Sequence, residues 1–128
     1  MSVSPLSSSL TASFAVFPRL QAEQLLQLRD DLGDEFPRFV SLFTEHSQHL
    51  LKTAQQSLMG HDLTQAKIAL HSFKGMSGTM GAERLFQLCK EAEAMAGNGE
   101  LKTLEQLIAN IEIELPELDK EIEQILNR

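Results

Sequence analysis

The chain has 128 residues, a length that suits a single domain. It carries 18 acidic and 11 basic residues, and its formal charge of −7 argues against nucleic acid or an anionic membrane as a partner. The single cysteine, Cys89, excludes an internal disulfide and a cysteine-based metal site. No apolar run approaches the roughly 18 residues of a membrane span, and the N-terminus does not resemble a secretory signal, so we expect a cytoplasmic protein.

The composition favours helix throughout, because leucine, glutamine, glutamate, alanine and lysine are abundant and β-branched residues are few. Residues 1–13 are rich in serine and lack periodicity, and we interpret them as a disordered tail. The folded domain is then expected over residues 14–128. A short first helix is predicted over about 18–32, since Pro18 suits an opening turn and Gly33 ends the pattern.

Capping and breaking residues predict four further helices. Asp34 is expected to cap the second helix, Pro37 is tolerated in its first turn, and Gly60 ends it. Asp62 is expected to begin the third helix. With Gly81 and Gly97-Asn98-Gly99 as the next breaks, the predicted helices span about 34–59, 62–79, 82–96 and 100–127.

Each long helix carries one apolar stripe, and the connections between the helices are short. These features predict an all-α fold, an antiparallel up-down-up-down four-helix bundle with an additional short N-terminal helix. Pro116 should bend or divide the last helix near Leu115. The stripes of the third, fourth and last helices are Ala66, Ala69, Leu70, Phe73, Ser77 and Met80; Leu85, Leu88, Cys89, Ala92 and Ala96; and Leu101, Leu104, Ile108, Ile111, Leu115, Leu118, Ile122 and Ile125.

The third helix carries glycines inside a helical pattern, where each costs about 1 kcal/mol relative to alanine. At about 100° of rotation per residue, His71 lies opposite the apolar stripe and points to water. Glycine has no side chain, so at this face it leaves free space beside the imidazole ring. Another large molecule could then reach the ring. The residues that share the face with His71 are Lys67, Lys74, Gly75 and Gly78.

The charge is unevenly distributed along the sequence. Residues 62–90 hold four basic and two acidic residues, a local balance of +2 within a chain of −7. His71 therefore lies in a basic neighbourhood of an acidic protein, although random scatter explains so few charges equally well. The other histidines, His46, His49 and His61, show no spacing typical of a metal site, and we expect them at the surface.

The segment around His71 resembles the signature of histidine phosphotransfer (HPt) domains, whose usual form is His-x-Leu-Lys-Gly-Ser-x-x-x-x-Gly-Ala. The similarity extends to the entry of the second helix and to the fourth helix, and covers about residues 20–126. Two positions depart from the pattern: Phe73 replaces the common leucine, and Met76 stands where serine is common. The matching motif reads His71-Ser72-Phe73-Lys74-Gly75, then Ser77-Gly78, then Gly81-Ala82.

This resemblance implies a phosphocarrier that has no autokinase activity and needs a partner receiver. His71 would accept a phosphoryl group from the aspartate of a receiver domain of a hybrid sensor kinase and pass it to the aspartate of a response regulator. Neutral imidazole suits this role, and Lys74 can pair with the phosphoryl oxygens. In some members an acidic residue matching Glu93 orients the ring; an ordinary exposed glutamate is the alternative. No cofactor is expected on this chain, and Mg²⁺ is expected on the partner receiver.

Docking would involve the surface around the histidine. Ile68 is an apolar residue on the outward side of the helix, and Lys67 is a further candidate, although a solvated lysine explains it as well. We expect a monomer. Two alternative functions stay open: the N-terminal phosphotransfer domain of a chemotaxis-type kinase, and a non-catalytic helical adaptor.

Overall fold

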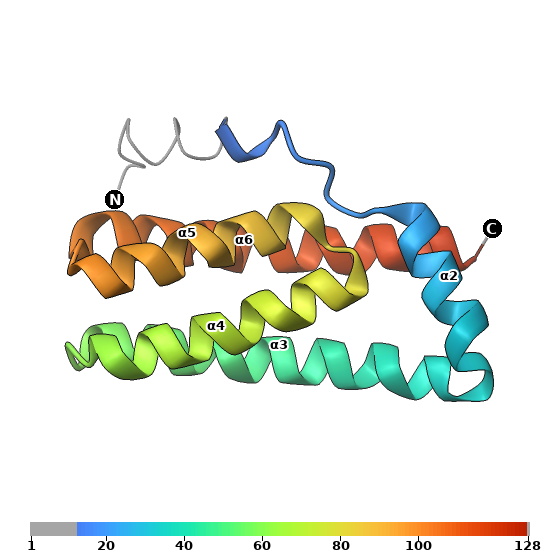
Figure 1. Ribbon diagram of the computed structural model, residues 1–128, viewed down its shortest axis with the longest axis horizontal. Coiled ribbons are helices and arrows are strands. Elements are labelled where there is room, and N and C mark those ends of the chain that lie inside the picture. Colours follow the sequence, from blue (N-terminus) through green and yellow to red (C-terminus); the bar gives the residue numbers. More distant parts are fainter. Residues whose placement is uncertain (1–12, 128) are drawn as a thin grey trace.

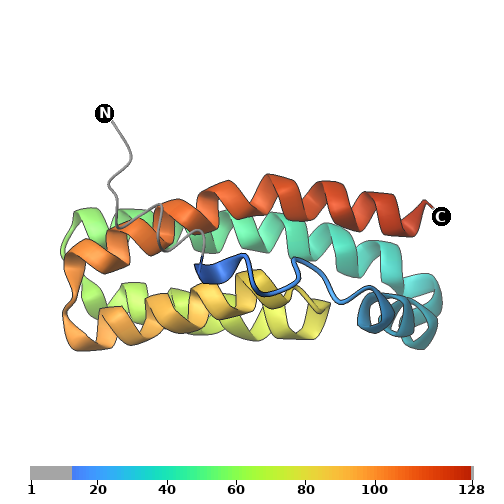
Figure 2. The ribbon, with the colours of Figure 1, turned by 90° about the horizontal axis from the view of Figure 1, so that it is seen from above.

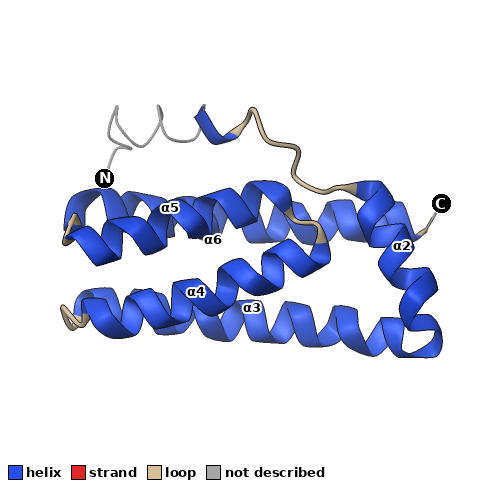
Figure 3. Ribbon diagram, in the orientation of Figure 1, coloured by secondary structure: helices blue, strands red, loops and turns tan. Residues whose placement is uncertain are grey.

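The computed structural model describes residues 13–127, and this part of the chain is helical, with short turns and no strand (Figure 3). Four long helices lie antiparallel along the molecule, while the shorter helix α2 (Ala22–Leu32) crosses one end of them (Figure 1). The predicted all-α bundle with an additional N-terminal helix is therefore confirmed. The elements are α2 (Ala22–Leu32), a 3-10 helix η1 (Gly33–Glu35), α3 (Phe36–Met59), α4 (Leu63–Met80), α5 (Glu83–Asn98) and α6 (Leu101–Leu126).

The four helices form two layers. Seen from above, α4 and α5 lie in one layer and α3 and α6 in the other (Figure 2). The pair α4 and α5 shares the most extensive contact, and the pair α3 and α6 the least among neighbouring long helices. None of the described helices combines the length and the apolar character needed to cross a bilayer. The serine-rich tail predicted for 1–13 lies outside the described residues, apart from Ser13 in a short helical turn.

The predicted apolar stripes form the core. Every residue predicted on the inner face of α4, from Ala66 to Met80, is buried, as is every predicted one of α5. In α6 the prediction fails at Leu101, which is 40% exposed because it lies in the first turn at the end of the bundle. Since the stripe of α4 faces inward, the opposite face, which carries His71, is turned to solvent.

Two predicted helix boundaries were wrong, and one of the two effects predicted for Pro116, a division of the last helix, does not occur. Pro18 precedes α2 instead of opening it, because its carbonyl accepts the Arg84 N–H at 3.1 Å and ties this segment to α5. Asp34 makes no side-chain cap; it lies in η1, which leads directly into α3. Pro116 does not divide α6, since it is exposed while Leu115 and Leu118 beside it are buried in the core.

Two end structures fix the position of α4. Asp62 caps its start as predicted, with Oδ1 accepting the Gln65 N–H at 3.1 Å. Gly81 ends it in the left-handed region, at φ 81°. The Gly81 carbonyl also accepts the Gln21 N–H at 2.8 Å, so the end of α4 is joined to the start of α2.

Candidate functional site

His71 lies in the middle of α4 on the face that does not pack into the core. Its side chain is 69% exposed, but one of its two ring nitrogens has a partner within the protein. The ring Nδ1 lies 2.9 Å from Oε2 of Glu93 on α5. The close packing of α4 against α5 therefore positions an otherwise exposed imidazole.

Glu93 bridges the histidine and a lysine. Its Oε1 lies 2.8 Å from Nζ of Lys74, one turn after His71 on α4. The Glu93 side chain is only 15% exposed. Desolvation acts to raise the pKa of Glu93, but hydrogen bonds from Lys74 and His71 outweigh it and hold that pKa below its ordinary value. The carboxylate is consequently ionised at neutral pH.

The ionised carboxylate determines which ring nitrogen carries the proton. A carboxylate can only accept a hydrogen bond, so Nδ1 of His71 must be the donor. In the neutral ring, Nε2 then has no proton and presents its lone pair away from Glu93. The arrangement leaves one nucleophilic nitrogen on the exposed side of the molecule.

The two glycines predicted to clear space beside the ring differ in their surroundings. A Cβ added at Gly75 would meet nothing within 4 Å, so this position is open. A Cβ at Gly78 would lie 3.4 Å from the ring of Phe86 on α5. Gly78 therefore does not extend the open space as expected, because Phe86 lies beside it at an ordinary van der Waals distance from where a Cβ would stand.

An apolar groove lies between α3 and α4 on one side of His71. It measures about 320 Å³ and includes Gly75 and Met76 from α4. Leu42, from α3, is 50% exposed at its edge. Ile68 on α4 is 57% exposed but does not line this groove. The remaining lining residues are Phe39, Phe43, His46 and Thr79.

A polar groove of about 400 Å³ lies between α4 and α5 and contains Lys67, Lys74 and Glu93. Lys67 reaches across to α5, where its Nζ lies 3.6 Å from the place a Cβ of Gly97 would occupy. Sequence reasoning missed two of its residues, Lys90 and Asn98. Lys90 precedes Glu93 by three residues, a helical spacing that could have indicated it.

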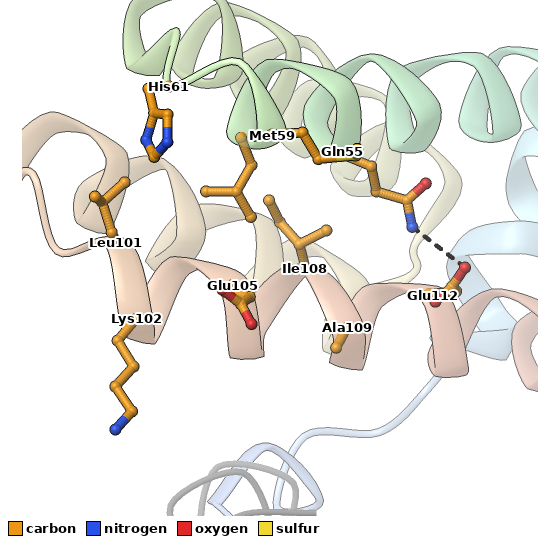
Figure 4. Close-up of a pocket in the computed structure, with 10 residues that line it drawn as sticks. Gln55, Met59, His61, Leu101, Lys102, Glu105, Ile108, Ala109 and Glu112 are labelled. Carbon is orange, nitrogen blue, oxygen red and sulfur yellow. Dashed lines mark hydrogen bonds between the residues drawn. The ribbon is translucent and has the colours of Figure 1, made fainter. Parts of the chain in front are cut away.

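Other parts of the described chain lack the features of this site. Residues 13–127 contain no group of three potential metal ligands. Cys89 is fully buried, and burial raises the pKa of its thiol far above the ordinary value, so it is inert. A larger groove of about 720 Å³ lies between α3 and α6, in the other layer, where Gln55 donates to Glu112 at 3.2 Å (Figure 4). It contains none of the predicted site residues.

Known proteins share this sequence pattern and fold. The Hpt domain family matches residues 38–128. The crystal structure of histidine-containing phosphotransfer protein B from Pseudomonas aeruginosa PAO1 is 33% identical, with a TM-score of 0.80 over 84% of this chain and 93% of that chain. An X-ray structure of a rice protein described as a histidine-containing phosphotransfer protein is 15% identical, with a TM-score of 0.76 over 97% and 96% of the chains, and supports the fold alone. No curated protein matches the sequence.

Proposed function

The chain belongs to the Hpt domain family, as its sequence predicted, and from this premise we propose that His71 carries the phosphoryl group of a phosphorelay. The observation that supports this most strongly is the contact of Nδ1 with Glu93 at 2.9 Å. It leaves Nε2 of an exposed ring free to attack. The protein acts as a phosphocarrier, and the partner domains supply the donor and acceptor aspartates.

The transfer step needs no proton to move. Nε2 of neutral His71 attacks the phosphorus of a receiver aspartyl phosphate; the N–P bond forms as the bond from phosphorus to the aspartate oxygen breaks. The aspartate leaves as a carboxylate, and the ring becomes a cation that keeps its Nδ1 proton. Glu93 accepts that proton's hydrogen bond and stabilises the positive ring. Passing the phosphoryl group to a second receiver reverses these bond changes.

The neighbours of the ring support this role. Lys74 holds the other oxygen of Glu93, and its two remaining N–H groups are available to phosphoryl oxygens. Gly75 leaves room for the receiver to bring its aspartate close.

We assign receiver docking to the apolar groove between α3 and α4, together with Ile68 on the outer side of α4. A receiver seated there would cover the exposed Leu42 and lie against Gly75. The proposal includes Mg²⁺ on the receiver, where it would neutralise the transferred group, and a monomeric, cytoplasmic carrier. Gel filtration and cell fractionation test the last two points.

The decisive experiment incubates the full chain with a receiver domain whose aspartate carries a radiolabelled phosphoryl group, in the presence of Mg²⁺. We expect label on the wild-type chain that is lost in acid and stable in base. His71→Gln should abolish it. The matched control is His49→Gln, which changes an exposed histidine on a different helix, α3. This variant should keep the label.

Other outcomes would favour the alternatives. Full labelling of His71→Gln contradicts the assignment of this histidine. Receiver binding without any label on the wild-type chain favours a non-catalytic adaptor. Labelling by an ATP-dependent kinase domain, but by no phosphorylated receiver, favours the phosphotransfer domain of a chemotaxis-type kinase.

A further inference from the structure

The two sides of His71 differ in their chemistry. Toward α3 lies the apolar groove with Leu42 and Met76. Toward α5 lies the polar groove, whose lining includes three lysines and one carboxylate, a local charge of +2. The whole chain has a formal charge of −7, so this positive groove is opposite in sign to the rest of the protein.

The three lysines line one groove, which also contains Glu93, the partner of His71. On α4, Lys67 lies one turn before the histidine and Lys74 one turn after it, while Lys90 stands on α5. Lys74 is paired with Glu93 at 2.8 Å. Within the described residues, neither Lys67 nor Lys90 forms an ion pair, and both side chains are exposed. Two ammonium groups that are unpaired in the described part of the chain therefore line the same groove as Glu93, the residue that contacts the ring, and are available to an anionic partner.

We propose that Lys67 and Lys90 are specificity-determining residues, which select receivers that carry acidic side chains on the surface facing the α4–α5 groove. This inference rests on the proposed function. The receiver would place apolar side chains over the α3–α4 groove and acidic ones over the α4–α5 groove, with its phosphoaspartate at the boundary. The two unlike grooves thus also define the orientation in which a receiver binds.

Charge of this kind acts on encounter and partner choice more than on the chemical step. Complementary charges speed diffusional encounter, and like charges exclude wrong partners. Salt weakens such attractions, because the Debye length is about 8 Å at physiological ionic strength. A receiver with a neutral or basic surface opposite the α4–α5 groove would gain nothing from the lysines.

Lys67 also has a purely structural explanation. Its ammonium lies near Gly97 in the last turn of α5, where a positive charge stabilises the negative end of the helix dipole. If that were its whole role, Lys67→Gln would lower thermal stability and leave receiver binding unchanged. The test therefore follows binding and thermal unfolding together.

The experiment compares wild type with the double variant Lys67→Gln/Lys90→Gln. The control is Lys52→Gln/Lys102→Gln, which removes two exposed charges from α3 and α6 in the other layer. The probe is a receiver domain that binds the wild-type chain, titrated as unphosphorylated protein for Kd and, where it labels the chain, as phosphorylated donor for KM and kcat. Binding and transfer are measured at about 20 mM and about 300 mM salt, and thermal unfolding is followed for each protein.

We expect the double variant to raise Kd and KM about tenfold at low salt, with kcat unchanged and the difference largely lost at high salt. Equal effects in the control would overturn the proposal, because net charge alone would explain them. A fall in kcat with Kd unchanged would also overturn it and would make the lysines part of the chemistry. If the receiver binds as expected but His71 receives no label, the proposed function fails while the docking inference stands.

Discussion

At the scale of single residues, the site depends on how one carboxylate uses its two oxygens. Glu93 accepts from His71 through one oxygen and from Lys74 through the other, at 2.9 and 2.8 Å. The lysine holds the carboxylate, and the carboxylate holds the ring. Removing Glu93 should therefore affect both the protonated nitrogen and the fixed position of the imidazole.

Glu93→Gln should slow phosphotransfer about 10-fold to 100-fold, because a charge-assisted hydrogen bond is worth about 1.5–3 kcal/mol. Initial rates of His71 labelling check this.

The lowered pKa of Glu93 also contributes to the stability of the fold. This contribution is present above the ordinary, unfolded-state pKa and is lost as pH falls through the lowered folded-state pKa. Urea unfolding should show wild type more stable than the variant at pH 7, with the difference vanishing in acid. Glu91→Gln, exposed on the same helix, should match wild type in both; equal rates in all three would contradict the role of Glu93.

At the scale of the helix, α4 contains glycines that serve different purposes at its centre and at its end. Gly75 is exposed, has open space beyond its Cα, and only weakens the helix. Gly81 has a positive φ of 81°, and a Cβ there would lie 3.3 Å from the carbonyl oxygen of Gln21. For the first glycine we propose a role in access to the ring, whereas the backbone path into α5 requires the second.

The variants Gly75→Ala and Gly81→Ala should accordingly change stability in opposite directions. Gly75→Ala should stabilise the protein by about 1 kcal/mol and slow phosphotransfer about tenfold, because a methyl group would stand beside the ring. Gly81→Ala should destabilise it by about 1–2 kcal/mol, because alanine is strained at positive φ. Urea denaturation and labelling rates measure both effects. A Gly75→Ala protein that transfers at the wild-type rate would show that this glycine does not serve access.

At the scale of the whole molecule, a buried ion pair joins distant parts of the chain. Glu114 on α6 is almost completely buried and accepts from Arg19, which precedes α2, at 2.9 Å. Arg84 at the start of α5 lies 3.9 Å from the same carboxylate and donates to the carbonyl of Phe17. Burial raises the pKa of Glu114, although both arginines act to lower it. The segment before α2 is thus held on the bundle by the ion pair of Arg19 with Glu114. The buried carboxylate depends on the two arginines to compensate its charge.

Arg19→Ala should destabilise the protein by about 2–3 kcal/mol at pH 7, because it leaves the Glu114 carboxylate buried with only the more distant Arg84. The loss should shrink as pH falls, since a carboxyl whose folded-state pKa is raised costs least when it is protonated. Denaturant unfolding at pH 5 and pH 7 measures both. Arg29→Ala, which removes an exposed pair with Asp30, should cost less than about 1 kcal/mol; a similar cost for the two variants would contradict the account of Glu114.

The sequence by itself determined the bundle, the buried faces of α4 and α5, and the exposure of His71, because helical periodicity places each residue on its face. It also indicated the helix breaks at Gly60 and Gly81, where backbone chemistry is local. It misplaced the start of α2. The Pro18 carbonyl accepts a hydrogen bond from the N–H of Arg84, a residue distant in the sequence. Periodicity describes one helix at a time and carries no information about the contacts between helices.

Only the tertiary structure decided which residues surround the ring. The alignment of α5 against α4 brings Glu93 to His71, although 22 positions separate them in the sequence. The same alignment places Phe86 beside Gly78 and gathers Lys67 and Lys90 into one groove. These relations depend on how one helix is rotated and shifted against another, and that is set by the packing of the whole core.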